Sequence, residues 1–355
     1  MQHIDISIIV PVYNAQAYIG GCLSSLQAQT FRNWECICVD DGSSDQSPDI
    51  VERFVAQDSR FRLIKQTNGG PGAARNTGLE AVQGEYFTFV DADDLVHPEM
   101  LERLLDLSRL HSADLVVCGF FYFKSDDEFH ELVRNPDLLL GETEVHAPPL
   151  LSGLLNWKQY RVHPWGKLHQ REMHGRLCFP HLFGPEDDYA SFDVYGRSER
   201  AVFSPMRLYG YRLVEEGLVR SVSKYRNYII GDAQVAMHCE AVCSEHGVDN
   251  VVKAQLVTKY VKRIFGYLNE MSIDERLSKN DKKDIMESAR DGLQNIKRCV
   301  AGKYRIVPLV HSVPYIAVRL SSLWLLVYWQ WVRLNILKKM KSFFQKSAGK
   351  GNDVV

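Results

Sequence analysis

The sequence predicts an α/β fold in which a mostly parallel sheet is covered by helices on both faces. Through the first 120 residues, short apolar runs alternate with segments of helical periodicity, and the links between them are short. This alternation favours a parallel sheet. Three of the apolar runs end in polar clusters, which read "PVYN", "VDDGSSD" and "VDADD". Ligands of such sheets bind beyond the carboxyl ends of the strands, so the clusters predict a binding site at that edge.

The elements of the first half follow from the pattern of apolar residues. "ISIIVPVY", residues 6–13, is a continuous apolar run halted by proline, as is typical of a strand buried on both faces. The elements expected after it are a helix from about residue 18 to 26, a strand at "WECICVDD", a helix near 46–57, a strand at Phe61–Lys65, a helix at about 73–83, a strand at Tyr86–Val90 and a strand at "ADLVVCGFFYF".

The alternation stops after about residue 122. Residues 124–150 are polar and are expected to form an irregular surface insertion. The stretches "HPWGKLHQRE", "FPHLFGPEDDYASF" and "AVFSPMRLYGYR" predict short strands and loops that return to the sheet. Helical spacing with charged faces from Asn227 to about Cys299 predicts a small helical subdomain.

The charge of the chain is unevenly distributed. The 355 residues carry a formal net charge of −2, which argues against disorder and against the basic field of a nucleic-acid-binding protein. Residues 301–350, however, contain nine Lys or Arg and no Asp or Glu. This basic, aromatic stretch predicts an anionic partner, most simply a membrane surface. The opening "MQHIDISIIVPVYN" lacks the features of a signal peptide, so a cytoplasmic location is expected.

The cluster "VDADD" places Asp91, Asp93 and Asp94 directly after a predicted strand. Where the chain turns, Asp91 and Asp93 can converge on one point, and carboxylate oxygens suit Mg²⁺ or Mn²⁺. One carboxylate would bind the ion while its neighbour accepts a hydrogen bond from a sugar hydroxyl. The alternative is a solvated turn in which Asp93 or Asp94 caps the helix that opens near Pro98.

Two further clusters change the weight of these interpretations. "VDDGSSD" offers Asp40 and Asp41, where a carboxylate can accept a hydrogen bond from a base N–H, such as that of uracil, or stabilise the turn. "TNGGPGAARNTGL" is a glycine-rich turn leading into a helix, so its backbone N–H groups and Arg75 suit a diphosphate. It has neither the Lys-Ser/Thr ending of a P-loop nor the G-x-G-x-x-G spacing, which disfavours ATPase and dehydrogenase functions.

Taken together, "SIIVPVYNAQAYIGGCLSSLQAQTFRNWECICVDDGSSDQS", "NGGPGAARNTGLEAVQGEYFTFVDADD" and "PEDDYASF" resemble the family-2 glycosyltransferases of the bacterial surface-polysaccharide type, which have the Rossmann-like A-type glycosyltransferase fold. The match runs through residues 4–215 in order and spacing. The domains that the resemblance and the composition imply are a catalytic domain at 1–225, with a nucleotide-sugar half at 1–120 and an acceptor half at 121–225, then a helical subdomain at 226–300 and a membrane-associating tail at 301–355.

The resemblance implies a role for each polar cluster. Pro11, Val12 and Tyr13 would line the base and ribose pocket, with Tyr13 stacked on uracil. The remaining donor contacts that it implies are Asp41 at the uracil N–H, Asn68 and Arg75 beside the nucleotide, and Asp91 and Ala92 at the ribose or the sugar. Asp93 would be the main ligand of Mn²⁺ or Mg²⁺, and oxygens of the donor diphosphate would complete the coordination.

Transfer with inversion needs a carboxylate that deprotonates the acceptor hydroxyl. In the family this base is the aspartate of a Glu-Asp pair on a loop leading into a helix, and here "GPEDDYASF" presents Glu186, Asp187 and Asp188. The spacing to Phe192 favours Asp187 as the base, with Glu186 supporting the acceptor, and Asp188 remains a competitor. The alternative is an acid-rich helix N-terminus, which the helix dipole favours by itself.

Two other features of the first 225 residues have two interpretations each. Trp165 and Lys167 in "HPWGKL" would form the floor of the acceptor site, unless the tryptophan belongs to the core. The stretch "YRLVEEGLVRSVSKYR" contains the basic residues Arg212, Arg220 and Lys224. They would form either a lid over the diphosphate or a solvated face.

The apolar run of the C-terminal stretch, from Leu320 to Val332, is shorter than the about 20 residues of a transmembrane helix. We therefore expect an interfacial amphipathic segment that docks the enzyme at a lipid-linked acceptor, with packing on the enzyme's own core as the alternative. The chain has no Q-x-x-R-W motif, so addition of single sugars is expected rather than processive synthesis.

The expected function is transfer of a hexosyl or N-acetylhexosaminyl unit from a UDP-linked donor to a surface-glycan or lipid-linked acceptor, at the inner face of the cell membrane. The glycan would belong to a capsule, an exopolysaccharide or a lipopolysaccharide. A sugar-nucleotide nucleotidyltransferase would need a basic loop near the N-terminus, and "PVYNAQAYIGG" contains no Lys or Arg. A non-catalytic glycan-binding scaffold would have lost the acid that binds the metal or the acid that serves as base, and the chain has both Asp93 and Asp187.

Overall fold

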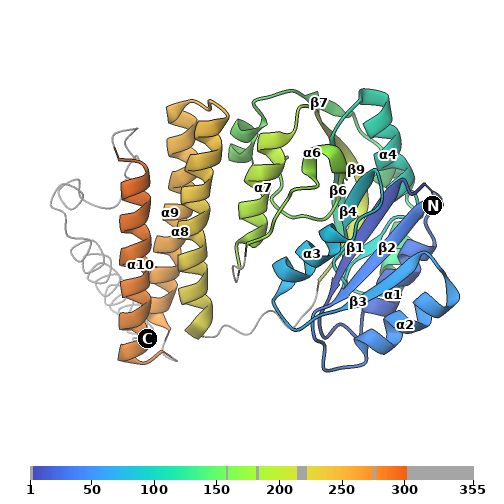
Figure 1. The fold of residues 1–355 in the computed structure, drawn as a ribbon, viewed down its shortest axis with the longest axis horizontal. Coiled ribbons are helices and arrows are strands. Elements are labelled where there is room, and N and C mark those ends of the chain that lie inside the picture. Colours follow the sequence, from blue (N-terminus) through green and yellow to red (C-terminus); the bar gives the residue numbers. More distant parts are fainter. Residues whose placement is uncertain (1–2, 157–158, 181–183, 214–221, 275–276, 302–355) are drawn as a thin grey trace, which may run out of the picture. The chain divides into compact units, whose positions relative to one another are not determined.

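The structure of the chain is a computed structural model, and it describes residues 3–156, 159–180, 184–213, 222–274 and 277–301 (Figure 1). The chain divides into two compact units. The first consists of residues 1–220 and 241–248, and the second of residues 221–240 and 249–355. The tail predicted at 301–355 lies outside the described residues, apart from Ala301.

One mixed sheet forms the centre of the first unit. Its strands lie in the order β3-β2-β1-β4-β8-β6-β9-β5, and β7 also pairs with β9. Their bounds are β1 Ile6–Val12, β2 Trp34–Asp40, β3 Phe61–Lys65, β4 Tyr86–Phe89, β5 Leu95–Val96, β6 Leu115–Phe123, β7 Glu144–His146, β8 Lys167–Gln170 and β9 Ala201–Arg212.

Strands β1 to β4, β6 and β9 point in one direction, and β5, β7 and β8 run against them. The carboxyl ends of the strands that precede the polar clusters therefore lie at one edge of the sheet.

Helices cover both faces of this sheet, as the sequence predicts. The helices of the first unit are α1 Ile19–Gln27, α2 Ser47–Gln57, α3 Pro71–Glu80, α4 Met100–His111, α5 Asp126–Leu132, α6 Arg171–His174 and α7 Glu186–Arg197. Alternate residues of β2 point to opposite faces. Cys36 and Cys38 pack in one core cluster with α1 and α4, whereas Ile37 and Val39 pack with Ala74 of α3. The A-type glycosyltransferase fold expected from the sequence is confirmed in this arrangement.

The segment 124–150 is more regular than its polar composition suggests. It contains α5, the 3-10 helix Pro136–Leu139 and β7, and a second 3-10 helix, Leu150–Leu155, follows it. Ser125 accepts a hydrogen bond from the Glu128 N–H at 3.3 Å and so caps α5, and Phe129 of α5 is buried. A side-chain cap and one buried aromatic are enough to hold a short helix whose other residues are polar. The expectation of an irregular insertion was therefore wrong for this part of the chain.

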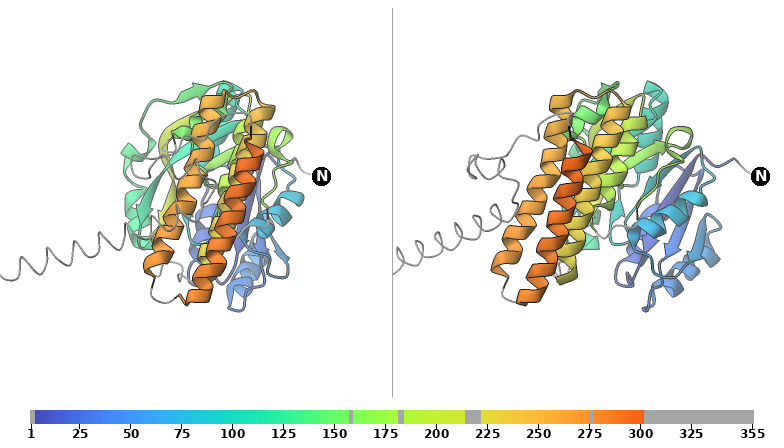
Figure 2. Two further views of the ribbon diagram at one scale, coloured as in Figure 1. Left: turned by 90° about the vertical axis from the view of Figure 1, so that its left-hand side faces the viewer. Right: turned by 60° about the vertical axis from the view of Figure 1, so that its left-hand side comes forward.

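Three long helices follow, and they are α8 Val222–Glu245, α9 Asn250–Ile273 and α10 Lys279–Cys299. In the views of Figure 2 they run alongside one another. Ser278 begins α10 with a capping box, in which its hydroxyl accepts from the Asp281 N–H and the Asp281 carboxylate accepts from the Ser278 N–H. The buried residues of α10 include Ile285, Ala289 and Ile296, which recur at helical spacing. Within the part of the chain that the structure describes, no helix has the length and apolar character needed to cross a membrane.

Candidate active site

The turn after β4 is fixed by residues of β9. The Tyr209 hydroxyl accepts from the Asp91 N–H at 3.1 Å and donates to the Asp94 carboxylate at 2.7 Å. The Arg212 N–H donates to the other oxygen of Asp94 at 2.8 Å. Asp94 is buried and points back toward β9, so it does not cap the following helix, whereas Asp91 and Asp93 are partly exposed. The cap that the alternative interpretation expected from Asp93 or Asp94 is absent at α4, and Asp91 and Asp93 are the acids of the turn that remain partly exposed.

The side chain of Arg212 binds the backbone of the same turn. Its Nε donates to the Asp93 carbonyl at 2.7 Å, and a terminal nitrogen lies 2.6 Å from Asp126. The residue is buried, with 7% of its surface exposed. The sequence had suggested that Arg212 forms either a lid or part of a solvated basic face, and the buried position of Arg212 contradicts both interpretations. Arg220 and the side chain of Lys224 lie outside the described residues.

A buried guanidinium connects this turn to the carboxylates predicted to supply the base. One terminal nitrogen of Arg75, on α3, donates to Asp91 at 3.2 Å, and the other donates to Asp187 at 2.9 Å. Glu186 lies 3.8 Å from the second nitrogen. Only 6% of the Arg75 side chain is exposed, so its guanidinium is shielded from water, while Asp91 and Asp187 each keep about a quarter of their side chains exposed. Arg75 therefore brings the predicted donor residue Asp91 and the predicted base Asp187 into one cluster.

Asn76 holds the backbone of Phe179 against α3. Its side-chain amide donates to the Phe179 carbonyl at 2.7 Å and accepts from the Phe179 N–H at 2.8 Å. Gly72, one turn earlier on α3, leaves room for this segment, because an added Cβ would approach Phe179 Cβ at 3.2 Å. The three acids Glu186, Asp187 and Asp188 form the first turn of α7. Two hydrogen bonds between the Asn76 side chain and the Phe179 backbone thus fix Phe179 to the helix that carries Arg75.

The electrostatics of this cluster favour protonated carboxyl groups. The pKa of Asp187 is raised to about 7: burial is the largest cause, the charge of Arg75 opposes the rise, and the neighbouring acids add to it. Burial also raises the pKa of Glu186. For Asp93 the pKa is raised by burial and by the charge of Asp91. A carboxyl group that titrates near neutral pH is suited to accept a proton. Asp187 lies 2.9 Å from a terminal nitrogen of Arg75 and Glu186 lies 3.8 Å from the same nitrogen, while Asp188 is buried in the same helical turn.

The two remaining polar clusters meet at the ends of β1 and β2. The Asn14 N–H donates to the Ser43 hydroxyl at 3.0 Å, and the Asn14 side chain accepts from the Ser44 N–H at 2.8 Å. Tyr13, next to Asn14, is 55% exposed, so its ring is free to contact a ligand. Pro11 is half-buried and Val12 is buried at the end of β1.

Asp41 supports the glycine-rich turn. One of its oxygens accepts from Gln66 at 2.7 Å and from the Gly69 N–H at 2.9 Å, and the other accepts from the Gly70 N–H at 2.8 Å. A carboxylate offers about four acceptor positions, so these bonds leave little capacity for a base N–H. Asn68, inside the turn, is exposed.

Trp165 belongs to a stack of rings. His163 covers one face at a centroid distance of 4.6 Å, and Tyr209 stacks on the ring at 4.4 Å. Only 6% of Trp165 is exposed. With its ring packed in this way, Trp165 cannot present an open face to a sugar, and any contact with an acceptor would involve the edge of the indole. Ala92 is also buried, in the turn after β4.

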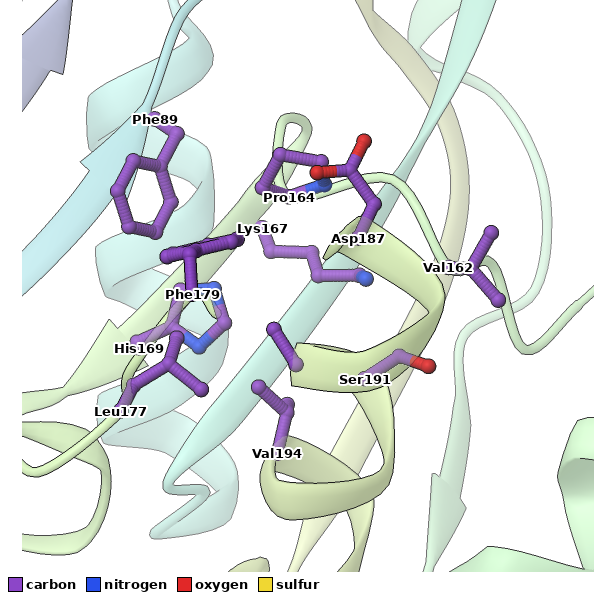
Figure 3. Close-up of a pocket in the computed structure, with 11 residues that line it drawn as sticks. Phe89, Val162, Pro164, Lys167, His169, Leu177, Phe179, Asp187, Ser191 and Val194 are labelled. Carbon is purple, nitrogen blue, oxygen red and sulfur yellow. The ribbon is translucent and has the colours of Figure 1, made fainter. Parts of the chain in front are cut away.

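Lys167 is buried below Asp187. Its ammonium donates to the carbonyls of Arg161 at 2.7 Å and His163 at 2.6 Å. Burial lowers the pKa of Lys167 to about 7. Figure 3 shows Lys167 and Asp187 among the side chains that line a small cavity between β8 and α7. Lys167 therefore holds the loop before β8, rather than forming an open floor.

Sequence reasoning missed two groups of this site. Asn76 lies inside the quoted "AARNTGL" motif, but its partner is a backbone group 103 residues away. Tyr209 lies in "YGYR", where the alternation of aromatic residues indicates one face of a strand, and this signal pointed to the residue without indicating its role. Among the described residues, the one set of three side chains arranged for a metal is His3, Asp5 and Glu85, at the opposite edge of the sheet.

The chain resembles known proteins in sequence and in fold. The family model of glycosyl transferase family 2 matches residues 7–176. A protein of Haemophilus influenzae, described as an uncharacterized glycosyltransferase, is 46% identical over 188 residues, which cover 53% of this chain and 70% of that protein. The provisionally assigned glycosyltransferase EpsH of Bacillus subtilis is 36% identical over 226 residues, which cover 62% of this chain and 64% of EpsH. The chain thus spans less than two thirds of the length of EpsH.

A solved structure resembles the fold. Residues 1–349 of S. aureus TarS, in complex with UDP-GlcNAc, superpose with a TM-score of 0.63 at 23% identity. The superposition covers 84% of this chain and 83% of that structure.

Proposed function

The chain belongs to glycosyl transferase family 2, and on this premise we propose that it is an inverting, non-processive glycosyltransferase. It transfers one hexosyl or N-acetylhexosaminyl unit from a nucleotide sugar to a glycan. The observation that carries the proposal is the cluster in which Arg75 contacts Asp91 at the end of β4 and Asp187 at the start of α7. A turn suited to a sugar nucleotide and a carboxyl group suited to a base are thereby placed side by side.

The proposed donor is a UDP-sugar. The S. aureus protein TarS, which shares the fold, has been solved with UDP-GlcNAc. In this chain the exposed ring of Tyr13 lies beside the joined loops of "PVYN" and "DGSS", where it can stack on a base. The glycine-rich turn that Asp41 supports borders the same edge, with Asn68 exposed in it. Asp41 then acts chiefly by shaping the turn, and any hydrogen bond to uracil uses its one remaining acceptor position.

The carboxylates after β4 fit a divalent cation. Asp93 is partly exposed, lies next to Asp91 and has a raised pKa, so a cation would relieve the repulsion between the two groups. Hard carboxylate oxygens are ligands that Mn²⁺ and Mg²⁺ favour, and these ions take diphosphate oxygens and water as well. Asp93 would hold the ion, and Asp91 would contact the ribose or the sugar. When bound, the ion would offset the charge that develops on the departing diphosphate.

Asp187 is the proposed general base. Its carboxylate takes the proton of the acceptor hydroxyl while that oxygen forms a bond to the anomeric carbon, and the bond from this carbon to the diphosphate breaks on the opposite side. Glu186, buried beside it, helps to bind the acceptor. Arg75 keeps part of the Asp187 population ionised, because it lowers the pKa that burial raises.

The proposed acceptor is a surface-glycan or lipid-linked precursor of a capsule, an exopolysaccharide or a lipopolysaccharide. The basic and aromatic stretch 301–350 would hold the enzyme at the inner face of the cell membrane, where such acceptors are extended.

The test is release of UDP by the purified full-length chain from a panel of UDP-sugars with Mn²⁺, in the absence of acceptor. One donor should be hydrolysed slowly, and EDTA and Asp93→Asn should each reduce the rate by at least about 100-fold. Asp127→Asn, an exposed carboxylate on α5, is the matched control and should leave the rate unchanged. If neither UDP-sugars nor GDP-, dTDP- and CMP-sugars are hydrolysed or raise the melting temperature, the proposal is wrong and a non-catalytic glycan-binding role replaces it.

A further inference from the structure

Two exposed tyrosines continue the ring stack that begins at Trp165. β6 and β9 pair in parallel, with Phe120 opposite Tyr209 and Tyr122 opposite Tyr211. Side chains two residues apart on a strand share one face of the sheet. The Tyr211 ring lies 5.5 Å from Trp165 and 5.9 Å from Tyr122. Tyr122 is 56% exposed and Tyr211 is 37% exposed. These two rings, here called the aromatic ledge, are the open end of an otherwise buried stack.

The aromatic ledge lies beside the turn that carries Asp91 and Asp93. Tyr209, two residues before Tyr211, forms hydrogen bonds with both Asp91 and Asp94. The N–H of Arg212, directly after Tyr211, donates to Asp94. The ledge is therefore held in place by the same hydrogen bonds that fix the acid turn.

Exposed aromatic residues are concentrated at this edge. Among the described Phe, Trp and Tyr residues, those that are exposed rather than half-buried or buried are Tyr13, Tyr122 and Tyr211. Each of them lies at or next to the carboxyl end of a strand, and these strands are β1, β6 and β9. Tyr13 is accounted for by the donor base in the proposed function, and the other two are not used by it.

We propose that the aromatic ledge of Tyr122 and Tyr211 is the acceptor subsite, on which a saccharide ring of the acceptor stacks. This inference rests on the proposed function, and it replaces the open Trp165 face that the sequence suggested. A pyranose has one face of C–H groups and a rim of hydroxyls. A tyrosine offers an apolar ring face for the first and a phenol for the second, whereas an acyl chain would gain nothing from the phenol. The packed rings of Trp165 and Phe120 behind the ledge keep the two tyrosines in fixed orientations.

The experiment uses the full-length chain and the donor that the UDP-release panel identifies. Transfer is measured against the concentration of a panel of methyl glycosides and disaccharides as acceptor probes. Tyr122→Ala and Tyr211→Ala should each raise the acceptor KM about 5-fold, because a lost ring contact of this kind is worth about 1 kcal/mol. UDP release without acceptor and the melting temperature should stay unchanged.

Two sets of control variants distinguish the loss of ring stacking from a general loss of structure. Tyr122→Trp and Tyr211→Trp should restore the acceptor KM, since each retains a flat ring. Leu110→Ala removes a 75% exposed apolar side chain on α4, away from the site, and should have no effect. An acceptor KM that stays the same in both alanine variants overturns the proposal.

The outcome separates the ledge from the proposed function. If the wild-type chain releases no UDP from any donor, the proposed function fails, and the ledge is then tested by saturation-transfer NMR with the same glycosides. Signals that disappear in both alanine variants support a saccharide subsite. The proposal is overturned if no glycoside gives a signal, or if the variants lose binding to phosphatidylglycerol vesicles while glycoside signals persist.

Discussion

At the scale of single residues, the site depends on one guanidinium between carboxylates that are far apart in the chain. Arg75 and Asp187 are 112 residues apart, and their side chains are 2.9 Å apart. Because Arg75 also contacts Asp91, a change at either carboxylate alters the electrostatics of the other. The ionisation of Asp187 is therefore the property that activity should follow most closely.

We expect the activity to fall on the acidic side of pH 7. Only the deprotonated form of Asp187 accepts a proton, and its pKa is raised to about 7, so kcat/KM should decrease about tenfold per pH unit below that value. Asp187→Asn should lower kcat by about 10³-fold and abolish this decrease below pH 7, which is the acidic limb of the pH profile. The measurement is the pH profile of UDP formation with acceptor present.

Asp188→Asn is the matched control, since it removes the adjacent acid of the same helical turn. It should retain most of the activity and keep the acidic limb. Loss of that limb in Asp188→Asn, with a normal profile in Asp187→Asn, would assign the base to Asp188 instead.

His169 should make the protein sensitive to acid. Its ring is buried and stacks on Phe87 at 4.9 Å, and burial lowers its pKa well below the usual value. The unfolded chain binds a proton near pH 6.5 while the folded chain does not, so the stability that this group contributes is complete above pH 6.5 and is lost as the pH falls.

Between pH 7 and pH 5, the melting temperature of His169→Phe should therefore fall less than that of the wild type. His130→Gln, an exposed histidine on α5, is the control and should follow the wild-type curve. Equal losses of melting temperature in His169→Phe and the wild type would show that His169 does not carry the acid sensitivity.

At the scale of elements, α3 connects the two parts of the site. It carries Arg75, and through Asn76 it holds the segment that leads into α7. We expect Asn76→Ala to destabilise the fold by about 1–3 kcal/mol, because two backbone groups of Phe179 lose their partner. It should also lower kcat by about 10-fold, since misplacement of a catalytic group has large effects on rate.

The check is to measure the melting temperature and UDP formation of Asn76→Ala beside Glu80→Ala, an exposed change at the end of the same helix. Wild-type values in both variants would contradict the role given to Asn76.

The elements also show how far sequence reasoning reaches. β3 was predicted at its observed bounds, and β1 and α2 within one residue, because apolar runs, polar turns and a proline in the first turn of a helix are local signals. Short strands were expected in the stretches that include "HPWGKLHQRE", but the four residues of β8 include the buried Lys167 and His169, so no apolar pattern indicated its bounds. Insertion of β8 between β4 and β6 depends on contacts that are distant in sequence.

The sequence identified many residues of the site, but it did not predict the contacts between them. Asp91, Asp93 and Asp187 were identified from motifs, and the structure brings their segments together. Their connection through Arg75, the support of the glycine-rich turn by Asp41 and the covered faces of Trp165 arise from packing between distant segments. Such packing leaves no signal in a single sequence.

At the scale of the whole molecule, the chain combines a sheet-based unit, a helical unit and a basic stretch outside the described residues. We expect that stretch to bind anionic membranes. Lys338→Gln with Lys339→Gln should weaken co-sedimentation with phosphatidylglycerol vesicles about 30-fold, since each lysine near such a surface contributes about 1 kcal/mol. The loss should be largest at low salt.

The matched control removes two lysines from a described helix. Lys279→Gln with Lys283→Gln changes the charge by the same amount on the exposed surface of α10, and it should leave vesicle binding unchanged. If both double variants bind vesicles as the wild type does, membrane association does not depend on the basic stretch.

The central claim is that Asp93 serves the donor and Asp187 the acceptor within one site. Calorimetric titration of UDP into the full-length chain, with and without Mn²⁺, tests it most directly. We predict that Mn²⁺ tightens UDP binding, that Asp93→Asn loses this dependence on the metal, and that Asp187→Asn keeps it. Equal affinity for UDP with and without Mn²⁺, or wild-type behaviour of Asp93→Asn, would contradict the claim.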